Sequence, residues 1–338
     1  MDLNTLMFIY IAFLFTGFFF LEGFDYGVGI LMPFVGKNDV ERRMVLNSIG
    51  PVWDANEVWM ITAGAALFGS FPHVYASLFS GFYLALILML VALIGRGSGF
   101  EFRSKRDSKA WRGFWDGLIF LGSLIPALLW GVTVGNLMRG IALDVTMTYW
   151  GGLLPLLNPF SLLCGLVFVG LFTTHGANYL GLKVGGEVEL RAKSLAFNAW
   201  IVSTVLTVIL LVTAFVATDI LNKPGINGLV PAILATLALL AGGYFIKVRK
   251  FGWAFVMIGL VVIFTTVMVF TGLYPRILIS NINPDFSLTI YNSASTATTL
   301  RLIGTIAVVI LPFILVYKAY AYWLFRKRVE AQVELLKY

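Results

Sequence analysis

Two pairs of acidic residues lie inside apolar segments of this sequence, where charged side chains are rare. Glu22 and Asp25 form one pair, and Asp54 and Glu57 form the other. The members of each pair are three residues apart, so on a helix they share one face. An ionisable group in a lipid environment is costly, and it persists where it lines a cavity, has a partner or serves a function.

Three interpretations are open for these carboxyl groups. They can form a proton relay, because a carboxyl group in low-dielectric surroundings can bind and release protons near physiological pH. They can instead form the cation site of a secondary transporter. The third interpretation is structural, with Arg42, Arg43 and backbone donors neutralising the acids.

Four further residues are candidates for function. Glu101 and Lys105 are spaced i, i+4 if helical and could collect protons at the mouth of a relay, or form an exposed salt bridge of little energy. His175 lies in an apolar segment; a haem needs an axial histidine or methionine, but an embedded histidine is more commonly a hydrogen-bonded core group. Trp59 follows the second acidic pair. It is either a functional residue or an ordinary packing tryptophan. Cysteine and histidine show no metal-site spacing, so no metal is predicted.

The composition indicates which elements hold these residues. The 338 residues are 59% hydrophobic and 12% charged, whereas soluble domains carry about 25% charged residues. The apolar segments are long enough to cross a bilayer core about 30 Å thick. We therefore predict an all-α polytopic membrane protein with one integral membrane domain, 1–338, whose first segment is retained rather than cleaved as a signal peptide. The nine predicted transmembrane helices are 6–32, 47–70, 74–95, 114–138, 159–181, 197–217, 228–246, 252–273 and 299–325.

The basic residues predict the orientation. Twenty of the 24 Lys and Arg fall in alternate connections and the C-terminal tail, with Arg96 counted in a loop and Lys318 in the tail. The positive-inside rule then places the N-terminus outside and the C-terminus in the cytoplasm. The net charge of +7 reflects this topology rather than nucleic-acid binding. All four acids fall in the inner half of the first helix pair, with Asp54 about 10 Å from the cytoplasmic start of the second segment.

A faint internal repeat relates the two halves of the chain. The segment 23–27, followed by a basic loop and Asn47, resembles 176–180 followed by Arg191 and Asn198. It predicts two four-helix units, 1–140 and 141–275, plus a peripheral ninth helix with a cytoplasmic tail, 276–338; chance similarity between glycine-rich helices is the alternative. Gly23 and Gly27 also predict a face for close helix packing.

Ordered motifs along the chain resemble subunit II of the cytochrome bd quinol oxidases. The motifs are EGFDYGVG (22–29), GKNDVERR (36–43), NSI (47–49), PVWDANEVW (51–59), ITAG (61–64), FSGFY (79–83), FEFRSK (100–105), LNPF (157–160) and GA (176–177). The similarity continues more loosely over the whole chain.

The resemblance implies a subunit of an electrogenic quinol oxidase in a bacterial cell membrane. Such a complex oxidises quinol at the outer face and reduces dioxygen to water with cytoplasmic protons, which generates proton motive force. Haems b and d and the quinol site belong to subunit I, and a very small third subunit often joins. This chain is expected to supply scaffold, a proton route and dioxygen access, without being catalytic alone.

The resemblance also implies roles for individual residues. Asp54 is the expected principal proton carrier, because it lies deep in the second segment and inside the most specific motif. Asp25 and Glu22 either extend the route or bind Arg42 and Arg43. Glu57 occupies a position where relatives can carry a neutral amide. Trp59 flanks a hydrophobic dioxygen channel towards the partner subunit. The alternative function, a secondary transporter with an acidic cation site, fits less well because the two units are expected to be parallel rather than inverted.

Overall fold

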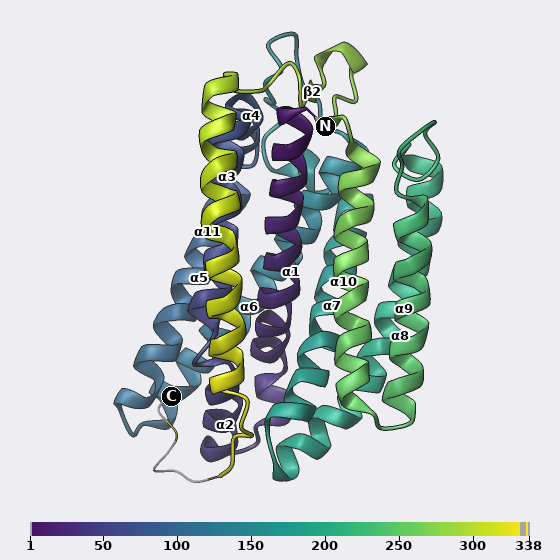
Figure 1. The fold of residues 1–338 in the computed structure, drawn as a ribbon. Helices are drawn as coiled ribbons and strands as arrows, with labels where there is room; N and C mark the ends of the chain where they lie inside the picture. Colours follow the sequence, from purple (N-terminus) through teal and green to yellow (C-terminus); the bar gives the residue numbers. More distant parts are fainter. Residues whose placement is uncertain (1, 332–335, 337–338) are drawn as a thin grey trace.

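The computed structural model describes residues 2–331 and 336, and its long helices lie side by side between two ends of the molecule (Figure 1). Within this described part, eight helices are long and apolar enough to span a membrane. They are α1 (Leu3–Val35), α5 (Tyr83–Phe102), α6 (Lys109–Arg139), α7 (Pro159–Lys183), α8 (Gly186–Ala217), α9 (Leu229–Lys247), α10 (Phe251–Leu273) and α11 (Ala297–Leu324). The chain is therefore a multi-pass helical protein, as its composition predicts.

Shorter elements connect these helices. They are α2 (Asp39–Ile49), α3 (Trp53–Ser70), α4 (Pro72–Gly81), the 3-10 helices η1 (Arg103–Lys105), η2 (Leu154–Leu157) and η3 (Pro284–Phe286), and the strands β1 (Arg276–Leu278) and β2 (Leu288–Thr289). The two strands pair antiparallel, at the end of the molecule where α1 begins (Figure 1).

Side-chain caps fix where several helices begin. The Asp2 carboxylate accepts a hydrogen bond from the Thr5 amide at 2.7 Å at the start of α1. At the start of α7, Asn158 accepts from the Ser161 amide at 3.0 Å, and Pro159 occupies the first helical position. A capping side chain satisfies an amide that has no partner inside the helix, and proline at that position loses no hydrogen bond.

The second predicted span is broken in the structure. Residues 47–49 end α2, and α3 begins only at Trp53, so Gly50 and Pro51 lie in a turn between the helices. Proline has no amide hydrogen to donate, which explains the break. Asp54 consequently lies in the first turn of α3, and not about 10 Å along a continuous helix as the sequence suggested. The acidic side chains of Asp54 and Glu57 also lower the hydropathy of α3. This helix has 18 residues but is not among the eight candidate membrane spans.

The third predicted span also differs from the structure. It comprises the short helix α4 and then α5, with a break at Phe82. Helix α5 continues through Arg96 to Phe102, seven residues beyond the predicted end at 95. Arg96 is thus a helical residue and not a loop residue, which changes the account of the acidic cluster below.

Helix α1 is the centre of the packing. It contacts α3, α6, α7, α10 and α11, and Figure 1 shows it between the α3–α11 side and the α7–α10 side. The crossing with α7 depends on glycine, because a Cβ at Gly27 would lie 1.9 Å from the Phe172 carbonyl oxygen and one at Gly176 would lie 2.5 Å from the Gly27 carbonyl carbon. A Cβ at Gly23 would lie 2.7 Å from the Phe172 ring. The predicted close-packing face is therefore confirmed.

Candidate functional site

A buried arginine lies at the centre of the acidic residues. Arg96 of α5 and Glu22 of α1 are both fully buried, and Arg96 Nη1 donates to Glu22 Oε1. The guanidinium carbon also lies 4.8 Å from the centroid of the Tyr26 ring and 5.6 Å from that of Phe100. A cation removed from water needs compensation, and here a carboxylate and two aromatic faces provide it.

The other three carboxyl groups are arranged around the same guanidinium. Asp25, Glu57 and Asp54 all lie within electrostatic reach of Arg96. Asp25 is fully buried, Glu57 is partly buried and Asp54 is exposed. The structure therefore brings the four acids together around Arg96, with burial increasing from Asp54 inwards.

Asp25 is held through an amide. Asn56 of α3 is fully buried, and its Nδ2 donates to Asp25 Oδ2 at 2.7 Å. On its other side, Asn56 Oδ1 accepts from Lys318 Nζ at 3.0 Å and from the Tyr322 hydroxyl at 2.9 Å. Helices α1, α3 and α11 are thus connected by one chain of hydrogen bonds.

Part of this cluster makes no hydrogen bond to protein. Among the described residues, Glu22 Oε2, Asp25 Oδ1 and two Arg96 nitrogens, Nε and Nη2, are buried without a partner. Buried polar atoms are normally satisfied, either by protein or by internal water. The site therefore offers acceptors and donors on two acids and one base to a solvent molecule or a proton in transit.

Asp54 lies on a different face of α3 from the buried Asn56. Asp54, Val58, Ile61 and Phe68 are all exposed and form one stripe along the helix. Ala65 belongs to the same stripe. Among the described residues, the Asp54 carboxylate accepts no hydrogen bond, and the charged groups within its electrostatic reach include Glu101, Arg96 and Glu57. A carboxylate thus lies at one end of an exposed apolar surface.

Glu101 and Lys105 are not the helical pair that their spacing suggested. Helix α5 ends at Phe102, and Lys105 belongs to the following 3-10 helix. Both side chains are exposed, and no ion pair joins them within the described residues. Glu101 is near Asp54 instead, so it lies next to the exposed end of the acidic cluster.

The two arginines proposed to neutralise Glu22 and Asp25 have other partners. Arg42 Nη1 forms an ion pair with Asp116 at 2.7 Å, and Arg43 donates to the Leu336 carbonyl. Arg96 is the base that pairs with Glu22. The structural interpretation was therefore correct that a base is present and wrong about which one. Arg42 belongs to a separate network at the end of the helices, in which Arg103 also binds Asp116, at 2.5 Å.

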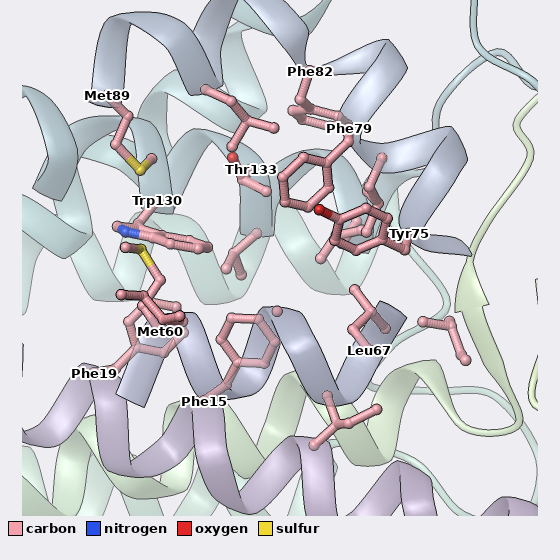
Figure 2. Close-up of a pocket in the computed structure, with 18 of the residues that line it drawn as sticks. Phe15, Phe19, Met60, Leu67, Tyr75, Phe79, Phe82, Met89, Trp130 and Thr133 are labelled. Atoms are coloured by element: carbon pink, nitrogen blue, oxygen red, sulfur yellow. The ribbon is translucent and has the colours of Figure 1, made fainter. Parts of the chain in front are cut away.

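A large apolar cavity (Figure 2) begins about one helical turn from the cluster, because Phe19 and Met60 of its lining are three residues from Glu22 and Glu57. Its volume is about 750 Å³, and its walls come from α1, α3, α4, α5, α6 and α10, with Phe168 of α7. Phe15, Phe19, Met60, Tyr75 and Trp130 project into it (Figure 2).

Trp59 does not line this cavity within the described structure. It is buried against α1, where a Cβ at Gly17 would lie 2.4 Å from the indole ring and the ring of Phe13 lies 5.9 Å away. Its neighbour Met60 is the residue that faces the cavity. The geometry is that of a packing tryptophan adjacent to the cavity wall.

His175 does not fit the role of a haem ligand. Its ring is fully buried and stacks on Phe255 at 4.5 Å with an interplanar angle of 9°. The rings of Phe20 and Phe24 are 5.5 and 5.8 Å away, so aromatic groups occupy the space around the imidazole. His175 is not among the described residues that line the cavity, where Met60 and Met89 bring thioethers without a histidine partner. Among the described residues, aromatic rings rather than a second axial ligand therefore surround His175.

Two basic residues that contact the acidic cluster escaped the sequence analysis. Arg96 was assigned to a loop because the apolar run ends at residue 95 and glycines follow at 97 and 99, although the helix continues through them to Phe102. Lys318 was counted with the tail although it lies inside the segment predicted as the ninth span. A lysine or arginine inside an apolar segment predicts a buried partner, and this signal points to both residues.

The comparisons with known proteins agree along the whole chain. Residues 3–325 match the family model described as cytochrome bd terminal oxidase subunit II. The chain is 38% identical to cytochrome bd ubiquinol oxidase subunit 2 of Bacillus subtilis (strain 168), over 97% of each sequence. It is 37% identical to cytochrome bd-I ubiquinol oxidase subunit 2 of Escherichia coli (strain K12), covering 95% of this chain and 94% of that one. A chain in the structure of bd oxidase from Geobacillus thermodenitrificans shares its fold, with a TM-score of 0.77 at 17% identity, over 97% of this chain and 100% of that one.

Proposed function

Because the chain belongs to the cytochrome bd terminal oxidase subunit II family, we propose that it provides a cytoplasmic proton route to its partner in the complex. Its family makes it a subunit of a cytochrome bd quinol oxidase in the respiratory chain and a multi-pass bacterial membrane protein. The haems of subunit I transfer electrons from quinol to dioxygen, and this chain contributes protons and scaffold rather than a reaction centre.

One observation carries the proposal: Asp54 is exposed at the end of an apolar stripe, and three partly or fully buried groups continue inwards from it. Glu57 is partly buried, and Asp25 and Glu22 are fully buried around Arg96. A series of carboxyl groups at graded depth is suited to passing protons, because each group can take one up and release it to the next. Glu101, exposed near Asp54, is the proposed entrance together with Lys105.

The same stripe indicates where subunit I docks. A carboxylate on a surface that faces lipid is unfavourable, whereas a partner subunit could supply the polar groups that Asp54 lacks within this chain. We therefore place subunit I on the α3 stripe formed by Asp54, Val58, Ile61, Ala65 and Phe68. Docking there would bring the haem-bearing subunit against the proton route, and a very small third subunit is expected to complete the assembly.

The orientation follows from the basic residues. Arg42, Arg103 and Arg191 lie near the end at which α1 finishes; the Arg191 Nε donates to the carbonyl of Val35 at 2.8 Å. The positive-inside rule makes this the cytoplasmic end, so the N-terminus is outside. The acidic cluster then opens towards the cytoplasm, from which the protons for dioxygen reduction are drawn. The two four-helix units and the ninth helix are the proposed division of this scaffold.

The apolar cavity is the proposed place of dioxygen access. Dioxygen is a small apolar molecule that partitions from water into apolar surroundings, and the walls of the cavity are almost entirely hydrocarbon and aromatic. Met60 forms part of its wall, and Trp59 supports that wall from behind by packing on Gly17. Trp59 would therefore control the shape of the cavity indirectly.

Substitution of Asp54 tests the proton route. Asp54 makes no hydrogen bond to a described residue, so Asp54→Asn should assemble with the full haem complement, yet reduce dioxygen at least about tenfold more slowly. Asp54→Glu, which keeps the carboxyl group, should retain much of the parent rate. Parent-rate turnover by Asp54→Asn would make Asp54 a structural residue and leave the proton route to subunit I.

The alternative function is a secondary transporter with these acids as its cation site. Co-purification separates the two functions, because a transporter should be stable and active without a haem-bearing partner. The oxidase subunit should instead bring down a second large subunit whose reduced visible spectrum shows haems b and d. The chain purified alone should show no stoichiometric haem band.

A further inference from the structure

Lys318 lies near the C-terminal end of helix α11 rather than in the tail that follows the helix. The helix continues from Ala297 to Leu324, and most of its side chains are exposed. Lys318 is an exception, because it is partly buried and its Nζ donates to the Ala55 carbonyl and to Asn56 Oδ1. A lysine placed inside an apolar helix indicates a partner or a function.

The two donors of α11 determine how the Asn56 amide is turned. Lys318 and Tyr322, one helical turn apart, both donate to Asn56 Oδ1, at 3.0 and 2.9 Å. The amide oxygen can only accept, so its Nδ2 must point the other way. That nitrogen donates to Asp25 Oδ2 at 2.7 Å. The two donors of α11 therefore orient Asn56 so that its amide nitrogen donates to Asp25.

The charge of Lys318 is compensated across this amide. Its two direct acceptors, the Ala55 carbonyl and the Asn56 amide, are neutral. The acids within its electrostatic reach are Asp25 and Glu22 of α1. Lys318 and Asp25 thus bind opposite ends of the Asn56 amide, and protonation of Asp25 would remove one of the two negative charges within reach of the lysine.

We propose that Lys318 is a positioning residue of the proton route, which holds Asp25 through Asn56 and favours its ionised form. The inference rests on the proposed function, since it assigns the control of one carboxyl group on the proposed route. Each proton that reaches Asp25 must be released again, and the nearby cation promotes that release. Lys318 would thereby keep Asp25 from retaining a proton between turnovers.

Other groups also face Asp25, and their charges must be held constant in a test. They are Glu22 on α1, Glu57 on α3, Arg96 on α5, Tyr179 on α7 and Tyr322 on α11. Only a change at Lys318 removes the charge that reaches Asp25 through Asn56 while leaving all of these in place.

The test compares charge and hydrogen bonding at position 318 in the intact oxidase complex. Lys318→Gln keeps a donor for Asn56 without the charge, and Lys318→Arg keeps the charge. We expect Lys318→Gln to assemble with parent haem content, to turn over several-fold more slowly near pH 7, and to move the alkaline fall in rate upwards by about half a pH unit or more. Lys318→Arg should restore the parent pH profile. Arg301→Met, on the exposed surface of the same helix, is the control and should behave as the parent.

Two results would overturn the inference. In the first, Lys318→Gln has the parent rate and pH profile. In the second, the haem is lost in both Lys318→Gln and Lys318→Met but kept in Lys318→Arg, which assigns the lysine to assembly alone. Asp25→Asn separates this failure from that of the proposed function: slow turnover with full haem in Asp25→Asn, beside a normal Lys318→Gln, would remove Lys318 from the route and leave the route in place.

Discussion

A small number of contacts compensates the desolvation cost of burying Arg96. Glu22 supplies the opposite charge, and the faces of Tyr26 and Phe100 cover the guanidinium. A buried pair of this kind is not itself a strong source of stability, because desolvation offsets most of the attraction. Breaking it is nevertheless costly, since the remaining charge keeps its desolvation penalty and loses its partner.

This asymmetry gives the first prediction. Arg96→Met should lower the free energy of unfolding by about 3–5 kcal/mol because Glu22 is left buried and unpaired. The double variant Glu22→Gln with Arg96→Met should recover most of that loss, as neither charge is then stranded. Heat denaturation of the purified complex, compared between single and double variants, measures the coupling. Equal stability of the single and the double variant would show that the pair does not account for the burial of Arg96.

The dioxygen cavity provides a second prediction for single residues. Met60 faces the cavity and Trp59 packs behind it, so Met60→Trp should raise the apparent KM for dioxygen while the KM for quinol stays the same. Trp59→Phe should change it in the same selective way but less, because the indole affects the wall indirectly. Steady-state respiration at varied dioxygen measures both. An unchanged dioxygen dependence in the two variants would count against access through this cavity.

At the scale of elements, glycine determines how closely α1 and α7 approach. A Cβ at Gly27 would lie 1.9 Å from a backbone oxygen of α7, and a backbone atom cannot move aside as a side chain can. We therefore predict that Gly27→Ala separates the two helices and destabilises the complex by at least about 2 kcal/mol. Gly117→Ala on α6 is the matched control, because nothing lies within 4 Å of its Cβ position. Thermal stability of the two variants tests the crossing, and similar values for both would refute it.

The elements also show what could be predicted from sequence. Helix α7 agrees closely with its predicted span, because Asn158 and Pro159 mark its start and apolar residues fill its length. The second span was misjudged because hydrophobicity alone does not register the turn at Gly50 and Pro51. The third was ended too early because Arg96 was treated as a marker of the membrane surface. Charge in an apolar segment has two meanings, a boundary or a buried pair, and only the tertiary structure decides between them.

The candidate site was predictable in part for the same reason. The spacing of the acids identified the cluster, since two pairs at i, i+3 on neighbouring helices must lie near one another. Its base and its amide bridge were not predictable, because Arg96 and Lys318 reach the cluster from helices far away in sequence. Asn56 gave no signal by itself, as an asparagine beside Asp54 and Glu57 has no spacing that distinguishes it.

The whole molecule is asymmetric in charge, and its proposed orientation can be tested at Lys223. This lysine lies in the loop between α8 and α9, on the side proposed to be outside. Burial, together with the nearby Arg276, lowers its pKa from the usual 10.5 to about 8. In about half of the molecules the Lys223 amine is therefore neutral, and so reactive, at about pH 8. An ordinary surface lysine is almost wholly protonated at that pH.

A membrane-impermeant amine reagent applied to intact cells should thus label Lys223, with a rate that rises most steeply near pH 8. Lys250, at the opposite end of α9, should react only after the membrane is made permeable. Peptide mass analysis of the labelled protein identifies both sites. Labelling of Lys250 in intact cells, with Lys223 protected until permeabilisation, would reverse the proposed orientation.

Proton delivery from the cytoplasm is the claim on which the account depends, and it can be measured in vesicles that hold the complex in one orientation. A dioxygen pulse is given to the reduced complex, and proton uptake from the side of Asp54 is followed with a pH-sensitive dye. The account predicts that Asp54→Asn, with its haem content intact, takes up protons at least about tenfold more slowly than the parent, while Asp54→Glu stays close to it. Uptake by Asp54→Asn from that side at the parent rate would contradict a proton route through this subunit.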